Sequence, residues 1–458
     1  MLAALLIAAA AAKLPDPGFA VRMVKMSGDP ASAKTQEHVR FCRDLGFNAL
    51  WVESREAGVW SREAAPEGPR VTPEFVRFAR WCRRKHLDVW VALRPWADSS
   101  GSFVFSDPDQ ERRLSEFASI LADKAGVRHL VLALDDAPDI LFELSDIQRY
   151  GQNAAHAHLD LTRRLSRALP AGVTLALAAG ASTDEQLLLG LEDLPENIAL
   201  VWNGPASLSP AITREDLLET RKRLGGRSII LEDNFPTDER WGFENAMALM
   251  LAPLSGREAG IRDVVAAYVA CPALPLAGSR LSLMTTAQFL KDPGAYDPAT
   301  ALKAAMARLS GGNAAAANAL DTQQLEWGGA PPGLNYWPPS RLNPALVARR
   351  LDDPAFVDSF TWTVDRYPGR MRDLGRLKDA PFREALLGMM HRRLGVARAV
   401  PLALDYLARV RNGDPESVAV LNRIDALRRD TAATDAAAGR VLEIFLTAAS
   451  IPKGTSAP

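Results

Sequence analysis

The chain of 458 residues has few cysteines and no excess of either charge. Its three cysteines, Cys42, Cys82 and Cys271, lack C-x-x-C spacing, so we expect buried thiols and neither a zinc site nor a disulfide framework. With 54 Lys+Arg against 55 Asp+Glu, the charge balance gives no support for binding of nucleic acid or an anionic membrane. Hydrophobic residues make up 48% of the chain, which is typical of a globular protein and not of a disordered one.

Motifs of several common enzyme classes are also absent. The patterns G-x-S-x-G, H-E-x-x-H and the P-loop do not occur, which argues against the commonest serine hydrolases, zinc proteases and nucleotide-binding proteins. The six histidines are scattered, and His156 and His158 lie two residues apart on a predicted helix, where they cannot share a face. We therefore expect no metal site and no organic cofactor.

The start of the chain is the one candidate targeting segment, because twelve uncharged and mostly apolar residues precede Lys13. Such a run is too short to span a bilayer but is typical of the apolar part of a secretory signal, and its alanines offer an A-x-A cleavage pattern. A basic segment before it is missing, and an Ala-rich terminus without a targeting role is the alternative. We expect residues 1–13 to be a signal peptide and the mature protein to be periplasmic or secreted, without membrane insertion.

Residues 19 to 290 alternate short, β-rich apolar runs with longer amphipathic stretches. Helical patterns separate the runs, and several of them open at Ser, Thr or Asp and close at Gly. Eight βα units favour a (β/α)8 barrel over residues 14–310 rather than a doubly wound sheet, and G-x-G-x-x-G is absent after the first run. The eight candidate strands are FAVRMVKM from Phe19, FNALWVES from Phe47, LDVWVAL from Leu87, HLVLALDD from His129, VTLALA from Val173, IALVW from Ile198, RSIILED from Arg227 and VVAAYVA from Val264.

The amino-acid composition of the chain changes after residue 310. Residues 311–343 are rich in Gly, Pro and Asn, which predicts a linker or an extended loop. Trp327, Tyr336 and Trp337 form an aromatic cluster there, which we expect to wedge the linker against the barrel, with a sugar platform as the alternative. Residues 344–458 show helical periodicity throughout and predict an all-helical C-terminal domain.

Two adjacent carboxylates, Asp135 and Asp136, follow the fourth predicted strand in LVLALDDAPDI. Catalytic residues of such barrels lie at the C-terminal ends of the strands, and other charged residues end neighbouring strands, so we expect a polar mouth above an apolar barrel. Two touching carboxylates raise the pKa of at least one, and a glycosidase needs one charged and one protonated acid. The alternative is that the pair only stops the strand and starts a turn.

Three segments around this pair carry a resemblance to a known family. AGVRHLVLALDDAPD, ALVWNGPASLSPAIT and IILEDNFPTDERWGFENAMALMLAPLSGRE resemble, in order and separation, the signature segments of glycoside hydrolase family 84, the β-N-acetylglucosaminidases that include O-GlcNAcases and bacterial hyaluronidases. The likeness extends over residues 45 to 310. It implies a (β/α)8 catalytic domain, a C-terminal helical domain, and an N-acetylglucosamine-containing glycan or glycoconjugate as substrate.

The resemblance also implies a retaining, substrate-assisted mechanism, in which the 2-acetamido oxygen attacks its own anomeric carbon to form an oxazoline. Asp135 would then orient the acetamido N–H, and Asp136 would be the general acid and then the base. Adjacent residues of a regular strand point to opposite faces, so both can serve one pocket only where the strand breaks. Pro138 favours such a break.

Other site residues of the family match this sequence to different degrees. Asn234 matches the family residue on the acetamido side of the pocket, Glu239 stands where the family has an Asp that holds sugar hydroxyls, and Arg55 stands where a Lys contacts the sugar. Trp202 is a candidate for stacking on a sugar, with core packing as the alternative. Arg257 is expected to hold a loop by a salt bridge.

Other positions depart from the family pattern. Glu232 replaces an aromatic residue before D-N, Cys271 replaces an Asn, and no G-F-Y-G motif follows the first strand. The sequence therefore favours an exo-β-N-acetylglucosaminidase-like hydrolase that uses Asp135 and Asp136. Two alternatives stay open: a non-catalytic relative that binds a glycan or protein, and a barrel glycosidase for another sugar.

Overall fold

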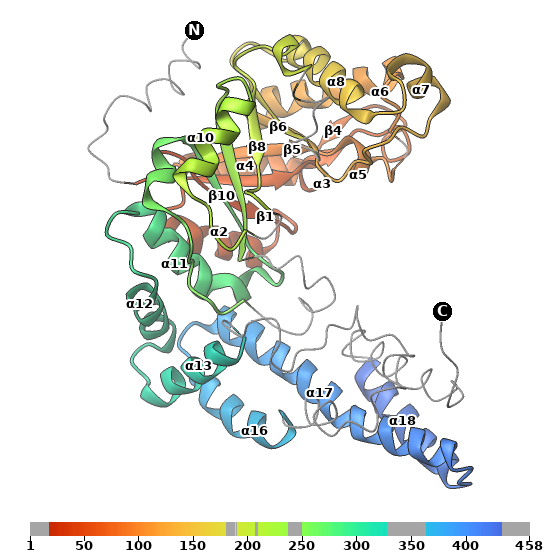
Figure 1. Ribbon diagram of the computed structural model, residues 1–458, viewed down its shortest axis with the longest axis vertical. Helices are drawn as coiled ribbons and strands as arrows, with labels where there is room; N and C mark the ends of the chain where they lie inside the picture. The colour runs from red at the N-terminus through yellow and green to blue at the C-terminus, as the bar shows by residue number, and fades with distance from the viewer. Residues whose placement is uncertain are drawn as a thin grey trace. The chain divides into compact units, whose positions relative to one another are not determined.

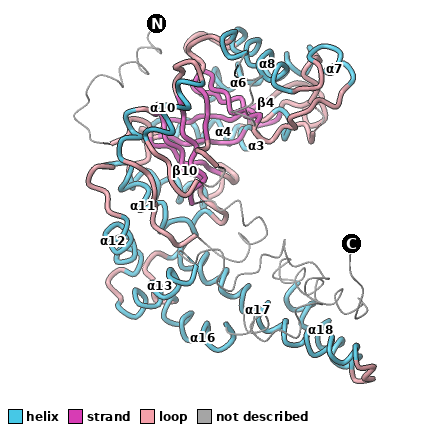
Figure 2. Tube along the Cα trace, viewed as in Figure 1, coloured by secondary structure: helices cyan, strands magenta, loops and turns pink. Residues whose placement is uncertain are grey.

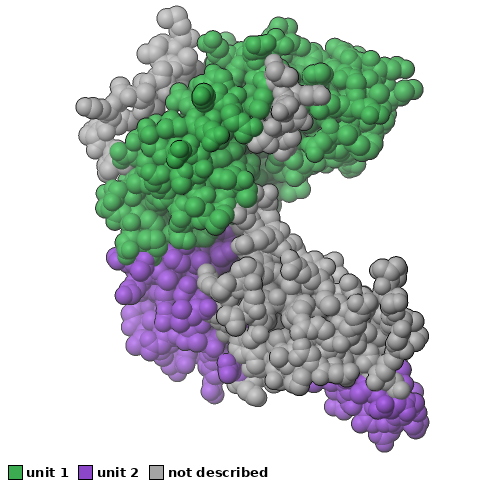
Figure 3. Space-filling model, viewed as in Figure 1, with its two compact units in different colours: residues 1–235, 254–272, 283–298 green, residues 236–253, 273–282, 299–458 purple. Residues whose placement is uncertain are grey.

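The computed structural model describes residues 18–101, 103–179, 188, 190–206, 209–236, 250–327 and 363–432. The predicted signal segment (residues 1–13), Glu239, Tyr336 and Trp337 lie outside the described residues, and the side chain of Trp327 is not described. The chain divides into two compact units, coloured separately in Figure 3. The first unit holds residues 1–235, 254–272 and 283–298, and the second holds 236–253, 273–282 and 299–458.

The first unit is built on a closed barrel of eight parallel strands, drawn as arrows in Figure 1 and in magenta in Figure 2. Neighbouring strands follow the chain order around the barrel, and β10 closes it against β1. All eight predicted strands are confirmed, and the (β/α)8 fold with them. The strands are β1 Arg22–Met26, β2 Ala49–Glu53, β5 Asp88–Leu93, β6 His129–Leu134, β7 Thr174–Ala179, β8 Ala199–Trp202, β9 Ile229–Pro236 and β10 Val265–Cys271.

Every second residue of each strand points into the barrel, and the residues at these positions are mostly apolar. Val131 and Ala133 of β6 and Val269 and Cys271 of β10 belong to this interior cluster, which also holds the buried indole of Trp51. The alternation assigns a face to each residue beyond the apolar layer, and so determines which polar side chains reach the barrel mouth.

Helices follow the strands of the barrel, and a short hairpin of β3 (Gly58–Val59) and β4 (Arg70–Val71) lies after β2. The Thr72 hydroxyl caps one helix by accepting from the Phe75 amide at 3.2 Å, and Thr213 and Asp216 form a capping box on another. The helical segments of this unit are α2 Ala33–Leu45, α3 Ser54–Ala57, α4 Pro73–Arg84, α5 Pro95–Asp98, α6 Pro108–Ile120, η1 Leu121–Ala125, α7 Leu144–Tyr150, α8 Ala154–Ala168, η2 Leu191–Asp193, α10 Arg214–Arg223 and η5 Ala259–Asp263.

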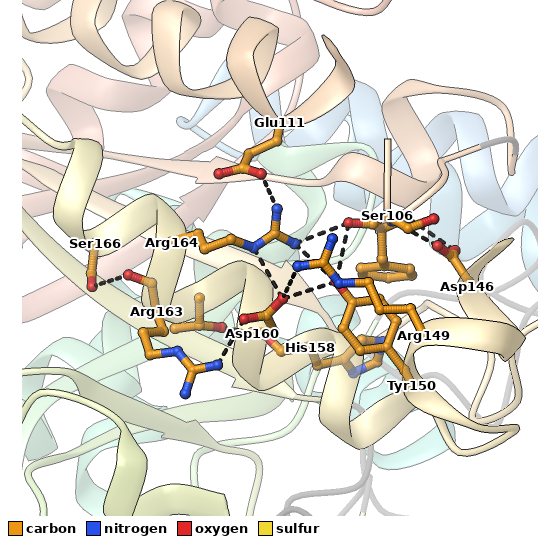
Figure 4. A network of polar contacts seen from close by, with 12 residues as sticks. Ser106, Glu111, Asp146, Arg149, Tyr150, His158, Asp160, Arg163, Arg164 and Ser166 are labelled. Carbon is orange, nitrogen blue, oxygen red and sulfur yellow. Dashed lines mark hydrogen bonds and ion pairs between the residues drawn. The ribbon is translucent and has the colours of Figure 1, made fainter. Parts of the chain in front are cut away.

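A polar network joins α6, α7 and α8 outside the barrel (Figure 4). The Asp160 carboxylate accepts from the Tyr150 hydroxyl at 2.9 Å and pairs with Arg163 at 2.7 Å and Arg164 at 3.1 Å. Arg164 also pairs with Glu111 and donates to the carbonyl of Phe105 at 3.0 Å. We call these residues the outer network.

The second unit contains helices, as the sequence predicted for the C-terminal part of the chain. Asp379 caps α17 by accepting from the Phe382 amide at 3.0 Å and pairs with the buried Arg280 at 2.6 Å, so one carboxylate fixes the helix start and holds it to residue 280. The helices from residue 276 onward are η6 Leu276–Ser279, α11 Arg280–Lys291, which continues into the first unit, α12 Pro298–Ser310, α13 Ala314–Trp327, α16 Thr363–Leu374, α17 Ala380–Arg411 and α18 Ser417–Ala432.

The linker predicted over residues 311–343 is wrong in its first half, because residues 314–327 form helix α13. The alanines and glutamines of AAAANALDTQQLEW are strong helix formers, and the Asn313 side chain accepts from the Ala316 amide at 3.0 Å at the helix start. Apart from Gly311 and Gly312, which precede the helix, the Gly and Pro residues that suggested a loop begin at Gly328. Residues 328–343 lie outside the described part.

The three cysteines, all within the described residues, are buried and form no disulfide, as expected. Among the helices that the structure describes, none combines the length and the apolar character needed to cross a membrane.

Candidate active site

The carboxylate pair lies at the C-terminal end of β6, where the strand breaks. β6 ends at Leu134, Asp135 and Asp136 form a turn, and the Ala137 amide donates to the Leu134 carbonyl at 3.1 Å. Asp135 continues the inward face of Val131 and Ala133, whereas 68% of the Asp136 side chain is exposed. The two carboxylates therefore differ sharply in environment although they are neighbours in sequence.

Asp135 carries a buried acceptor that no protein donor satisfies. Within the described residues its Oδ1 atom is buried and has no hydrogen-bond partner. Burial raises the pKa of Asp135, the charge of Glu232 raises it further, and Arg94 and Lys25 oppose both effects. A buried acceptor without a donor is costly, so this atom is where a ligand N–H or O–H gains most.

A continuous chain of polar contacts crosses the barrel mouth. Lys25 Nζ lies 2.8 Å from Glu232 Oε1 and 3.6 Å from Glu53 Oε1, and thereby joins β9 to β2 through β1. At one end the Cys271 thiol donates to Glu232 Oε1 at 3.6 Å. At the other, Arg94 lies 3.3 Å from Glu53 Oε2 and pairs with Asp136. We call these residues, Cys271, Glu232, Lys25, Glu53, Arg94 and Asp136, the polar chain.

Apart from Asp136, the polar chain is largely withdrawn from solvent. The side chains of Glu232 and Glu53 are 3% and 4% exposed, against 24% for Lys25 and 16% for Arg94. Burial lowers the pKa of Lys25, but Glu232, Cys271 and Glu53 more than offset this and raise it above its ordinary value. Burial and Glu232 raise the pKa of Cys271, so the thiol keeps its proton. Besides the exposed Asp136, the cations are therefore the members that remain partly accessible from the mouth.

Of the predicted site residues Asn234, Trp202 and Arg55, Asn234 alone stands beside the polar chain. Asn234 is half-buried on the face of β9 that also carries Ile230 and Glu232, so it stands next to the polar chain. Trp202 is buried on the face of β8 opposite the inward Val201, away from the mouth. Arg55 in α3 is 68% exposed, and its nearest acid is Glu56 at 4.0 Å.

Asp233 belongs to the outer face of β9 and not to the mouth. Arg257 grips both its oxygens at 2.7 and 2.6 Å, and the buried Tyr268 hydroxyl donates to it. Arg257 also donates to the Ser255 carbonyl at 2.8 Å. The predicted loop-holding salt bridge of Arg257 is thus confirmed, and it fixes residues 255–257 against β9.

Lys25 is the site residue that sequence reasoning missed. The signal was present, because Val21, Met23 and Lys25 alternate onto the inward face of β1 and Lys25 is the one polar residue among them. An inward lysine at the C-terminal end of a barrel strand needs a buried counter-charge, which Glu232 and Glu53 supply.

Oxygen acceptors and cations dominate this mouth. Among the described residues, no group of three or more His, Cys, Asp or Glu side chains has the arrangement of a metal site. The geometry suits acid–base chemistry on an uncharged polar ligand, with Asp135 as acceptor and Asp136 as an accessible carboxyl.

Comparison with known proteins agrees with this fold. A family model described as beta-N-acetylglucosaminidase matches residues 69–322, which is more than half of the chain. An aspartate-to-asparagine mutant of the O-GlcNAc hydrolase from Thermobaculum terrenum has a similar structure, with a TM-score of 0.62 at 19% identity over 95% of this chain and 94% of that one. CpGH84B has a TM-score of 0.57 at 13% identity over 95% of this chain and 77% of its own. At these identities the likeness concerns the fold.

Proposed function

Because the chain belongs to the β-N-acetylglucosaminidase family, glycoside hydrolase family 84, we propose that it is a retaining exo-β-N-acetylglucosaminidase that works by substrate-assisted catalysis. One observation carries the proposal: the buried, unsatisfied Oδ1 of Asp135 stands beside the exposed carboxyl of Asp136 at the barrel mouth. Its substrate is a glycan or glycoconjugate that ends in β-linked N-acetylglucosamine.

Asp135 receives the acetamido N–H of the substrate. This contact satisfies Oδ1, and it orients the amide so that its carbonyl oxygen reaches the anomeric carbon. As the oxazoline forms, the amide nitrogen gains positive charge, and an ionised Asp135 stabilises it more in the transition state than in the ground state. The neighbouring cations Arg94 and Lys25 favour that ionised form.

Asp136 transfers the proton. It protonates the departing glycosidic oxygen as the carbon–oxygen bond breaks, and then takes a proton from the water that opens the oxazoline. Its exposed position suits both steps, because the aglycone leaves and water enters from the solvent side of the mouth.

The ion pair between Arg94 and Asp136 supports a second candidate, a glycan-binding relative without turnover. In the unliganded protein Arg94 stabilises the ionised carboxylate, whereas a general acid must carry a proton. In the catalytic reading Arg94 shifts toward Glu53 when substrate binds, and in the binding reading it stays on Asp136.

The test is hydrolysis of 4-nitrophenyl glycosides by the wild type and by Asp136→Asn and Asp135→Asn. We expect release of 4-nitrophenol from the N-acetyl-β-glucosaminide, and a loss of about 10²- to 10⁴-fold in kcat/KM in each variant. An N-trifluoroacetyl substrate should react more slowly than the N-acetyl one, since its carbonyl is a weaker nucleophile.

Arg163→Gln in the outer network is the matched control, because it alters an ion pair of the same unit away from the mouth. Turnover that survives Asp136→Asn would show that the acid is misassigned. Well-folded protein that binds N-acetylglucosamine but cleaves no glycoside supports the second candidate. For the location we propose export, which a processed N-terminus on the protein recovered from its native host would test.

A further inference from the structure

The polar chain lines the barrel mouth with charged groups, and we call this lining the floor. An acetyl methyl group would need apolar neighbours instead. Glu232 Oε1 holds both Lys25 and Cys271, and all three side chains lie on the inward faces of β9, β1 and β10. Asp135 follows the inward face of β6, and its neighbour Asp136 pairs with Arg94 of the polar chain, so the group that Asp135 binds lies next to this floor.

In the buried part of the floor the charges are balanced, and the third carboxylate, Asp136, lies at its exposed end. Lys25 and Arg94 face Glu232 and Glu53, with every cation within 3.6 Å of a carboxylate oxygen. An ionised substituent placed on this buried part would add a charge without a counter-ion in a poorly solvated place, which is unfavourable. A methyl group would shield the ions from water and would form no hydrogen bond with them. A neutral group that both donates and accepts hydrogen bonds suits the floor best.

Hydrogen-bonding capacity remains on the floor. A lysine ammonium has three N–H donors, and Lys25 donates one to Glu232 at 2.8 Å, while Glu53 at 3.6 Å is an ion-pair partner only. The Lys25 side chain is 24% exposed. Within the described residues, Glu232 makes both contacts through Oε1, which leaves Oε2 as an acceptor. A hydroxyl group between them would accept from Lys25 and donate to Glu232.

We propose that this site prefers 2-acylamido sugars whose acyl group ends in a hydroxyl, such as N-glycolylglucosamine, over N-acetylglucosamine. The proposal rests on the proposed function, since it takes the amide N–H to be held by Asp135. The glycolyl carbonyl stays available as the nucleophile, and its terminal hydroxyl takes the place of the acetyl methyl on the floor. Lys25 and Glu232 are then the residues that determine the acyl group.

The experiment compares 4-nitrophenyl β-glycosides of N-glycolyl-, N-acetyl- and N-propionylglucosamine, together with binding of the free N-glycolyl and N-acetyl sugars to Asp136→Asn by calorimetry. We expect the N-glycolyl sugar to exceed the N-acetyl one by about threefold to tenfold in kcat/KM and in affinity, which is the value of one well-placed hydrogen bond. The N-propionyl substrate should be the poorest.

A double variant, Lys25→Met with Glu232→Leu, removes the ion pair without leaving either charge alone in the interior. It should reverse the order, so that N-acetyl exceeds N-glycolyl. Glu74→Leu with Arg77→Met, an exposed ion pair on α4, is the matched control and should keep the wild-type order.

The two proposals fail in different ways. Equal or weaker binding of the N-glycolyl sugar to Asp136→Asn overturns the acyl preference, whatever the protein hydrolyses. If the double variant does not fold, the wild-type panel and the calorimetry decide alone. Preferred binding of the N-glycolyl sugar without turnover of any substrate by wild type would sustain the preference and overturn the hydrolase.

Discussion

Two polar clusters of the same unit use the same side chains in opposite ways. In the outer network, the Asp160 carboxylate has Tyr150, Arg163 and Arg164 as partners (Figure 4). At the barrel mouth, Oδ1 of Asp135 is buried with no partner among the described residues, although two cations lie near. The Asp160 carboxylate is satisfied without a ligand, and the Asp135 carboxylate is not.

The difference separates stabilising from functional polar groups. A buried carboxylate with several donors stabilises the helices that carry the donors, while an unsatisfied one raises the free energy of the folded state. A protein retains such a cost at positions where a ligand completes the hydrogen bonds. The same substitution in the two clusters should therefore have opposite effects.

The largest effect is expected for Asp135→Asn. The amide cannot stabilise the positive charge that develops on the acetamido nitrogen, so kcat/KM should fall about a thousandfold, equivalent to about 4 kcal/mol. The stability of the folded variant should instead increase. Because burial raises the pKa of Asp135, the folded state loses stability as pH rises above the unfolded pKa of an aspartate, and the variant avoids this loss.

Thermal unfolding at two pH values tests this trade-off. Asp135→Asn should unfold at a higher temperature than wild type at pH 7, and the gain should vanish near pH 3, where the wild-type carboxyl is protonated in both states. A variant that is inactive and less stable at pH 7 would mean that Oδ1 has a partner in solution and that the mouth resembles the outer network.

His158, beside the outer network on α8, should set the acid limit of stability. It is buried against Phe105 with ring centroids 5.2 Å apart, and burial lowers its pKa from 6.5 to about 4. The unfolded chain binds a proton below pH 6.5 and the folded one only near pH 4, so stability falls as pH drops through this window. The loss amounts to about 3 kcal/mol.

Urea unfolding at pH 7 and pH 4.5 measures this contribution. His158→Leu should lose less stability than wild type on acidification, whereas His156→Leu, an exposed position on the same helix, should follow wild type. Equal acid sensitivity of wild type and His158→Leu would assign the acid limit to other groups.

Asp160→Asn is the counterpart of Asp135→Asn in the outer network. It weakens the ion pairs to Arg163 and Arg164 in a side chain only 15% exposed, and should lower the free energy of unfolding by about 2 kcal/mol. Activity at 25 °C should stay within twofold of wild type. A change in the pH profile of kcat/KM would instead link the outer network to the mouth.

Much of the fold followed from local pattern. Each barrel strand is a short apolar run bounded by turn residues. Thr72 and Thr213 are typical N-cap residues, and in the structure the side chain of each caps the helix that follows. Helix α13 was missed because Gly and Pro further along dominated the composition of its window, although its own residues favour a helix.

The site was less accessible to sequence. The D-D pair is visible because a strand end with two acids is unusual. The polar chain, in contrast, joins residues on four strands with two that follow β5 and β6, and Lys25 and Glu232 are separated by 207 positions. Strand alternation gives the face of each residue, and only the closed barrel tells which faces meet. Arg55 shows the converse: it matches a family position, yet α3 turns its side chain to solvent.

Arg55→Ala should have the smallest effect of all. The side chain is 68% exposed and 4.0 Å from its nearest acid, so its removal should change stability by less than about 0.5 kcal/mol. Since Lys25 and Arg94, and not Arg55, are the cations of the polar chain at the mouth, KM should stay within twofold in Arg55→Ala but rise about tenfold in Lys25→Gln. Steady-state kinetics on the preferred N-acyl substrate, with circular dichroism for folding, measure both. A tenfold higher KM in Arg55→Ala alone would mean that α3 moves over the mouth when substrate binds, and that the sugar-binding cation comes from a loop and not from β1.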